Sequence, residues 1–274
     1  MQDQAAGDDS PVLARAPLLL SESLLFPYKD GLSFEQDVWM DKGRKAAFEG
    51  VLDRPPASSW EVMNPRAYEQ GKQSPVLSMP DIHPLLNSRY KPYDIGQVGQ
   101  LDLRILAQIF GGEGAARDLT PAWDGGIYWA GQLISAKTAE EQSSTKSIAL
   151  MYLSAWKSTA SAHVFARMYA DQVGRKYSGV KLDVADMPLN DAHGEETIYT
   201  TNEGPVVITV RGKYVFVAES FDLATARKLT DLLIDGQGKG EIRTAKVTTS
   251  EPGLSANLIR FLHSCGMMRA AIVR

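Results

Sequence analysis

The stretch that most constrains how this chain can fold runs from Ser147 to Tyr177. Its first part is an apolar run over residues 148–153 that continues to Trp156, and a run this short and apolar is typical of a strand buried on both faces. Ser158 or Thr159 then offers a hydroxyl that can cap the start of a helix. The residues that follow place one apolar stripe at helical spacing, formed by Ala162, Phe165, Ala166, Tyr169 and Val173. The sequence therefore predicts a strand–helix unit that forms the core and on which the flanking elements pack.

Composition is that of an ordinary globular protein and excludes several kinds of site. The 274 residues suffice for one large domain or two small ones, and 44% of them are apolar and 23% charged. The net charge of −4, with mixed signs, gives no indication of nucleic-acid binding. Cys265 is the one cysteine, which excludes an internal disulfide and a multi-cysteine metal site. No apolar run is long enough to span a membrane, and no cofactor is predicted.

The prolines divide the chain into three predicted regions. Residues 1–75 form an N-terminal helical region, and residues 93–274 form an α+β sheet domain. Four prolines fall between residues 75 and 92, where they favour an extended or irregular backbone. Residues 76–92 are therefore predicted to be a linker.

Helix signals in the N-terminal region predict two helices separated by a turn. Pro17 suits the first turn of a short helix that runs through Leu25 and that Pro27 ends. Asp30-Gly31 is a turn signal, and residues 34–52 then show helical apolar spacing, with Gly43 as a potential break.

From residue 90 onward the predicted order is strand, helix, two strands, helix, three strands and helix. Residues 206–210 and 213–218 flank Arg211-Gly212, which indicates a β-hairpin with a tight glycine turn. Residues 180–196 are predicted to be a long polar loop, and Asp222 can cap a helix over residues 223–234. Hairpin-linked strands favour a mixed or antiparallel sheet with helices packed on one face, so the predicted fold class is α+β.

The stretch after residue 236 fits more than one structure. Residues 236–253 are rich in Gly and Thr, which is typical of a loop. Further on, Leu258, Ile259 and Leu262 favour a helix, whereas residues 270–273 favour a short strand.

Two groups of polar residues are the candidates for a metal site. Asp81 and His83 lie in the proline-rich segment, and Asp191, His193 and Glu195 lie close together in the predicted loop. Neither group has two histidines one helical turn apart, as in an HExxH helix, and the second lacks the spacing of an EF-hand loop. We interpret both as surface loops, so these five residues are weak metal candidates and no catalytic or cofactor-binding residue is predicted.

Other patterns have a structural interpretation that we favour over a functional one. Residues 111–114 resemble a phosphate-binding loop, but they follow a predicted helix and lack the Lys-Ser/Thr pair, so they end or interrupt that helix. The sequence contains no GxSxG elbow, and His263 and Cys265 lack the spacing of a catalytic dyad on a helix. Five aromatic residues could line a ligand cleft but are interpreted as core: Trp123, Tyr128, Trp129, Tyr152 and Trp156.

Four local motifs, taken in order, resemble a known family over about residues 11–235. The motifs are Leu24-Leu25-Phe26-Pro27-Tyr28 with Asp30-Gly31-Leu32 and Phe34; Arg54-Pro55-Pro56-Ala57-Ser58-Ser59 with Val62-Met63-Asn64-Pro65 and Tyr68; Trp123-Asp124-Gly125-Gly126 with Tyr128; and Trp156 with Ala162 and Phe165. Together they resemble the C-terminal half of an uncharacterised family of exported bacterial proteins of the acidobacterial type. In that family an upstream half with an HExxH helix looks like a zinc metallopeptidase.

The chain departs from this family at the positions that bear on chemistry. Asn64 stands where the family's second motif has a histidine, the third motif reads AWDGG where the family has GWGGD, and this chain has no HExxH segment. No metal ligand therefore carries over to any residue here. The resemblance implies a non-catalytic accessory or interaction module of a metallopeptidase-like envelope protein, with a protein or peptide partner.

Two alternatives belong to other functional classes. The first is a metal-dependent hydrolase whose composite site combines Asp81 and His83 with the acids of residues 183–196. The second is a structural subunit of a larger bacterial assembly. Residues 1–9 are polar and acidic and lack the basic region of a signal peptide, so export is implied by the resemblance alone.

Overall fold

The computed structural model describes residues 16–189 and 194–237. The chain divides into two compact units, and the boundary between them follows Ser74. Within the described ranges, no helix combines the length and the apolar character needed to cross a membrane.

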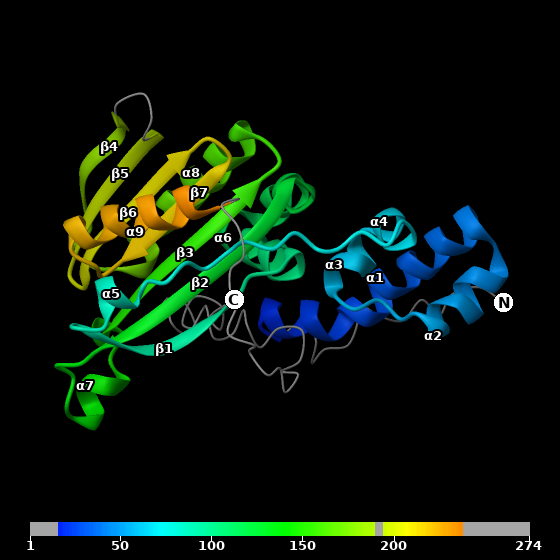
Figure 1. Cartoon of the computed structure of the whole chain (residues 1–274), viewed down its shortest axis with the longest axis horizontal. Coiled ribbons are helices and arrows are strands. Elements are labelled where there is room, and N and C mark those ends of the chain that lie inside the picture. The colour runs from blue at the N-terminus through cyan, green and yellow to red at the C-terminus, as the bar shows by residue number, and fades with distance from the viewer. Residues whose placement is uncertain (1–15, 190–193, 238–274) are drawn as a thin grey trace. The chain divides into compact units, whose positions relative to one another are not determined.

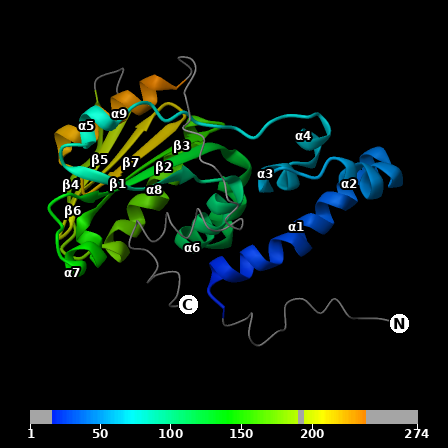
Figure 2. The same ribbon diagram turned by 60° about the horizontal axis from the view of Figure 1, so that its bottom comes forward.

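The first unit is helical, and its longest element is the helix α1 (Leu18–Lys42), which Figure 2 shows in blue. Its core is small and consists of Phe34, Val38, Ala47, Val51 and Tyr68. The shorter helical segments after α1 are a π-helical turn (Ala46–Gly50), α2 (Val51–Asp53), α3 (Ser59–Met63) and α4 (Pro65–Glu69).

The prediction of two helices separated by a turn is wrong, because α1 continues through Pro27 and Gly31. Pro27 is exposed, so water can satisfy the carbonyl group that loses its helical partner. Phe34 and Val38, one turn apart, are buried in the core of this unit, and their packing outweighs the local turn signal. The helix ends before Gly43, whose φ of 84° favours glycine.

The second unit is built on a seven-stranded sheet with the strand order β1-β2-β3-β7-β6-β5-β4 (Figure 1). Every neighbouring pair of strands is antiparallel, which confirms the predicted α+β class with an antiparallel sheet. The strands are β1 (Tyr90–Gln97), β2 (Trp123–Leu133), β3 (Ile148–Trp156), β4 (Lys181–Leu189), β5 (Gly194–Thr201), β6 (Gly204–Arg211) and β7 (Tyr214–Glu219).

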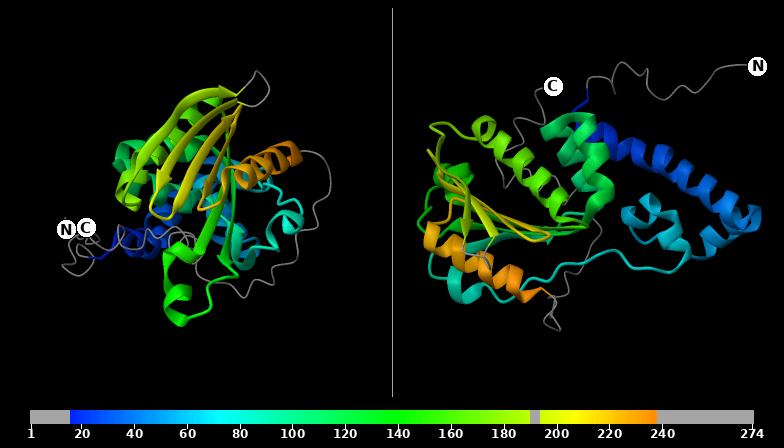
Figure 3. Two further views of the ribbon diagram at one scale, coloured as in Figure 1. Left: turned by 90° about the vertical axis from the view of Figure 1, so that its left-hand side faces the viewer. Right: turned by 90° about the horizontal axis from the view of Figure 1, so that it is seen from above.

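Helices cover both faces of this sheet, whereas the sequence predicted helices on one face (Figure 3). The helices α6 (Gln100–Leu119) and α8 (Thr159–Lys176) lie on one face, and α9 (Leu223–Gly236) and α5 (His83–Leu86) lie on the other. β3 explains the arrangement: all nine of its residues are buried, and a strand that is apolar on both sides needs cover on both. The remaining short helices are η3 (Thr120–Ala122), α7 (Ala139–Ser143) and η4 (Thr145–Ser147).

The predicted strand–helix unit is confirmed at the centre of the sheet. The side chain of Ser158 caps α8 by accepting a hydrogen bond from the backbone N–H of Ser161 at 3.1 Å. Phe165 is fully buried, and its ring centroid lies 4.8 Å from that of Trp156 and 6.0 Å from that of Tyr152. The alternate residues of β3, among them Met151, face the α9 side. One strand thus anchors the cores on both faces.

Other predictions for this unit have mixed outcomes. The hairpin is confirmed, with Gly212 at a φ of 58° between β6 and β7. The kink of α6 at Gly112 fits the predicted interruption, and the five aromatic residues interpreted as core are all buried.

The predicted loop over residues 180–196 is wrong, because it contains β4 and the start of β5. β4 is the last strand of the sheet. Three charged residues and a proline interrupt its apolar residues, as is typical of edge strands, so the sequence gave no clear strand signal: Lys181, Asp183, Asp186 and Pro188.

The segment predicted to be a linker lies in the second unit and contributes to its core. Leu77, Ile82, Leu86 and Tyr90 are all buried in the apolar cluster beneath α9. Residues 72–82 have no regular secondary structure, and the short helix α5 follows them. A count of prolines detects the irregular backbone but not the burial of the residues between the prolines.

Leu86→Ala should destabilise the protein by about 2–5 kcal/mol, because it leaves a cavity at a side chain that is 1% exposed. The matched control is Val76→Ala in the same segment, where the side chain is exposed and the expected change is within about 0.5 kcal/mol. Guanidinium denaturation measures both. Equal unfolding free energies for the two variants would show that the segment is not part of the core.

Candidate functional site

A hollow of about 700 Å³ lies between residues 80–85 of the proline-rich segment and α9, and we call it the α9 groove. Both elements contribute apolar side chains to its lining, and both contribute charged side chains. The apolar residues are Pro80, Pro84, Leu85 and Leu232, and the charged residues are Asp81, Lys228, Asp231 and Asp235.

One wall of the α9 groove is the outer side of α9. The helix starts at Asp222, whose Oδ1 accepts a hydrogen bond from the backbone N–H of Thr225 at 2.9 Å. Leu229 and Leu233 are fully buried against the sheet. Residues 228, 231 and 235 are consequently left on the exposed side of the helix, three or four positions apart.

The other wall is held in place by hydrogen bonds as well as by its buried leucines. The backbone N–H of Ser78 donates to Oε1 of Gln237 at 3.0 Å, and Nε2 of Gln237 donates back to the carbonyl of Ser78 at 2.8 Å. Oδ1 of Asp81 lies 2.8 Å from Nδ1 of His83 and accepts the backbone N–H of His83 at 3.0 Å. The side-chain bond, and then the backbone bond, hold the pKa of Asp81 below its usual value.

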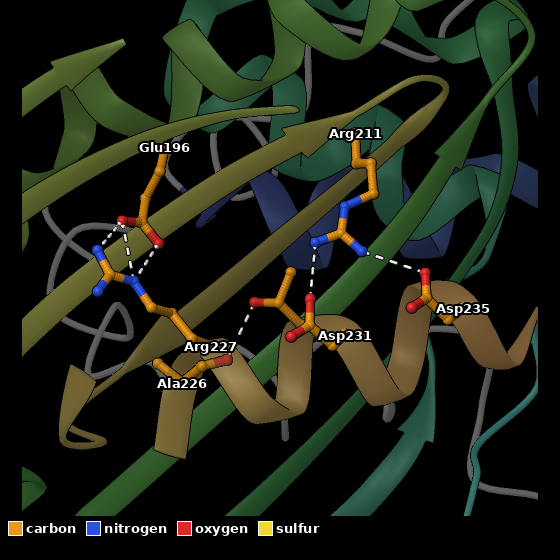
Figure 4. Close-up of polar contacts among 7 residues, drawn as sticks. Glu196, Arg211, Ala226, Arg227, Asp231 and Asp235 are labelled. Carbon is orange, nitrogen blue, oxygen red and sulfur yellow. Dashed lines mark hydrogen bonds and ion pairs between the residues drawn. The ribbon is translucent and has the colours of Figure 1, made fainter. Parts of the chain in front are cut away.

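Arg211 of β6 joins the two acids of α9 (Figure 4). Its Nη2 donates to Oδ1 of Asp231 at 2.8 Å, and its Nη1 donates to Oδ1 of Asp235 at 3.1 Å. The side chain of Arg211 is only 14% exposed, whereas those of Asp231 and Asp235 are 53% and 60% exposed. Because the guanidinium is largely covered, the α9 groove presents carboxylates to solvent.

A second arginine, Arg227, fixes the start of α9 to the sheet (Figure 4). Its Nη2 donates to Oε1 of Glu196 on β5 at 2.6 Å, and its Nε donates to Oε2 at 3.2 Å. Glu196 is 1% exposed, so this two-point contact supplies the cation that a buried carboxylate requires. The hydrogen bond to Glu196 raises the pKa of Arg227 above its ordinary value.

The structure separates the weak metal candidates into different places. Asp81 and His83 contact each other at the surface, beside the α9 groove. Glu195 instead contacts His163 of α8, with its Oε2 3.1 Å from Nε2 of the histidine. Since Glu196, the next residue, bonds to α9, Glu195 points to the opposite face of the sheet from Asp81. Asp191 and His193 lie outside the described residues. Residues 16–189 and 194–237 contain no group of three or more His, Cys, Asp or Glu side chains that could hold a metal ion.

A buried charge cluster ties α8 to the end of β7. Lys176 forms an ion pair with Oε2 of Glu219, and both side chains are 2% exposed. The hydroxyl groups of Tyr169 and Tyr177 donate to the two carboxylate oxygens of Glu219, each at 2.9 Å. The ion pair and both hydrogen bonds converge on Glu219, which fits a structural role in docking the helix.

Asp102, in the first turn of α6, is a buried carboxyl group of a different kind. Its Oδ2 accepts the backbone N–H of Gly99 at 2.8 Å, whereas its buried Oδ1 has no hydrogen-bond partner in the described part of the chain. Burial raises the pKa of Asp102 to about 7, and the bond from Gly99 offsets only part of that effect.

Sequence reasoning missed most of the residues that line the α9 groove. The spacing of Lys228, Asp231 and Asp235 could have placed them on one helix face. No sequence signal places the distant residues 80–85 opposite that face.

Comparison with protein-family models, with curated proteins and with solved structures finds no match for this chain. The resemblance of the four motifs therefore stays a prediction.

Lys176→Met should lower the free energy of unfolding by about 3–5 kcal/mol, because it leaves the Glu219 carboxylate buried without a cation. The double variant Lys176→Met/Glu219→Gln should recover a large part of this loss, since it removes both charges. Lys181→Met is the matched control: its ion pair with Asp183 is at the surface and should cost less than about 1 kcal/mol. Urea denaturation distinguishes these cases, and a similar small loss for both lysines would contradict the structural role.

Asp102→Asn should flatten the dependence of stability on pH. In the unfolded chain the carboxyl group titrates near 3.8, whereas in the folded protein its pKa is about 7, so the folded state binds the proton more tightly. Stability should therefore fall as the pH rises through this interval, by up to about 4 kcal/mol, and change no further above it. The measurement is the unfolding free energy of wild type and variant between about pH 5 and about pH 8. Parallel pH profiles would show that Asp102 is not the responsible group.

Proposed function

We propose that this chain is a binding module whose α9 groove takes a peptide segment with apolar side chains and one basic side chain. The observation that carries the proposal is the groove itself, a hollow of about 700 Å³ with an apolar lining and exposed acids. This volume lies within the range of about 300–1,000 Å³ that is typical of ligand pockets.

Charge favours a basic ligand. The lining contains three carboxylates, those of Asp81, Asp231 and Asp235, and one cation, Lys228. Arg211 neutralises part of this charge, but from a largely covered position beneath two carboxylates that face solvent. A ligand amine or guanidinium can therefore approach Asp235 without displacing Arg211, while its neighbouring side chains contact Leu85 and Leu232.

The contacts of the polar clusters support binding over catalysis. Asp81 and His83 contact each other at the surface, where the aspartate also accepts the backbone N–H of His83. The composite hydrolase would need these two residues to meet the acids of residues 183–196. Of these acids, Glu195 lies on the opposite face of the sheet, and Glu196 is paired with Arg227. Glu196 and Glu219 are each held by a cation and have structural partners.

The role within a larger protein rests on the motif resemblance alone. On that basis, the module is an accessory or interaction part of a metallopeptidase-like envelope protein, and its partner is a protein or peptide. The α9 groove supplies the contact surface in that proposal, whichever protein carries the ligand.

The test is selection of peptides from a randomised display library against the full chain, followed by fluorescence anisotropy on the selected peptides. We expect apolar peptides that contain Lys or Arg. Asp235→Asn should weaken their binding by about tenfold or more, because it removes one charge-assisted contact. Asp118→Asn is the matched control, since this acid is exposed on α6, away from the α9 groove.

Two results would contradict the proposed function. The library could yield no enriched peptide, or Asp118→Asn could weaken binding as much as Asp235→Asn does. Enriched peptides that lack basic residues and bind the Asp235→Asn variant unchanged would place the ligand elsewhere on the molecule.

A further inference from the structure

The α9 groove has a defined direction, because the segment that forms its second wall is tied to both ends of α9. At the C-terminal end of the helix, Ser78 exchanges two hydrogen bonds with Gln237. At the start of the helix, Nη1 of Arg89 donates to Oδ2 of Asp222 at 2.8 Å. Residues 78–89 therefore run antiparallel to α9, so a position along one wall of the groove identifies the facing position on the other.

The negative charge of the α9 groove gathers at the C-terminal end of the helix. Pro80 packs beside Gly236, where a Cβ atom would come within 3.8 Å of the proline ring, and Asp81 follows it into the lining. Asp235 lies at the same end, and the last turn of α9 contains no basic residue to compensate the negative end of the helix dipole. This end of the groove therefore suits the basic side chain of a ligand.

The one cation in the lining, Lys228, lies toward the start of α9. Its side chain is exposed, and the acid one turn further on, Asp231, is already held by Arg211. The preceding residue, Arg227, points to the sheet and is held by Glu196 (Figure 4). Lys228 is thus the cation that the start of the groove presents to a ligand, and it suits an anionic group.

The spacing of these charges sets the spacing on the ligand. Lys228 and Asp235 are seven residues apart, which is nearly two turns, so they lie on one side of α9 about 10 Å apart along its axis. A peptide in the polyproline II conformation returns to the same side every three residues, over about 9 Å. Two turns of a helical ligand with its side chains occupy roughly 800 Å³ or more. That exceeds the hollow of about 700 Å³, so an extended ligand fits better.

We propose that the α9 groove selects an extended peptide that carries one basic and one acidic side chain three residues apart. The basic side chain lies against Asp235 and the acidic one against Lys228. Lys228 then determines both specificity and orientation, because a reversed ligand would bring like charges together at each end. This inference rests on the proposed function, to which it adds the second charge and the spacing.

The test is selection from a randomised peptide library against the full wild-type chain and, in parallel, against Lys228→Glu. The matched control is Arg167→Glu, the same charge reversal at an exposed position of α8, on the opposite face of the sheet. We expect wild type and Arg167→Glu to select an acid three residues from the basic residue. Lys228→Glu should select a second Lys or Arg at that position.

Fluorescence anisotropy on the peptides selected by wild type measures the contribution of the acid. Replacing the acid by Gln should weaken binding to wild type by about fivefold or more, because it removes one charge-assisted contact. The same replacement should not weaken binding to Lys228→Glu, which lacks the cation.

Three results would contradict the inference, and they separate it from the proposed function. Basic peptides with no preferred acid, or with the same preference in wild type and Lys228→Glu, would overturn the inference and leave the proposed function standing. An acid seven residues from the basic residue would mean a helical ligand and would overturn the extended form. A library that yields no enriched peptide would overturn both.

Discussion

The second unit depends on one constraint, which is that β3 has apolar side chains on both of its faces. All nine residues of the strand are buried, so neither face can be left to water. Phe165 and its neighbours on α8 cover one side, and Leu229 and Leu233 of α9 cover the other. The segment through Leu86 completes the second cover, which is why a proline-rich stretch belongs to the core. The position of the α9 groove follows from this requirement.

Charged residues then fix where the covering helices sit. Arg227 holds α9 to Glu196 of β5, and Lys176 holds α8 to Glu219 of β7. Each contact satisfies a carboxylate that would be costly to bury alone, so a helix that slid along the sheet would lose the pairing. Apolar burial supplies the stabilisation in this arrangement, and the ion pairs select one position for each helix.

The candidate site was predictable only in fragments. Asp81 and His83 were recognised as a pair from their spacing, and they do contact each other. The acids of α9 were not recognised, because a helix with charges on its outer side is the ordinary pattern of a solvated surface. Asp81 lines the same groove as Asp231 and Asp235 only because the fold brings the proline-rich segment next to α9. These two segments lie about 150 positions apart in the sequence.

The sequence by itself determined the local elements: the strand–helix unit, the caps at Ser158 and Asp222, and the glycine turn at Gly212, since each depends on side chains within a few positions. The tertiary structure decided which local signals were overridden. α1 passes through Pro27 because packing at Phe34 and Val38 outweighs the turn signal. β4 forms despite its charged residues and Pro188 because its neighbour β5 offers backbone hydrogen bonds. It also decided that Glu195 meets His163 and not Asp81, because side chains alternate between the faces of a strand and the register of β5 sets which face each one takes.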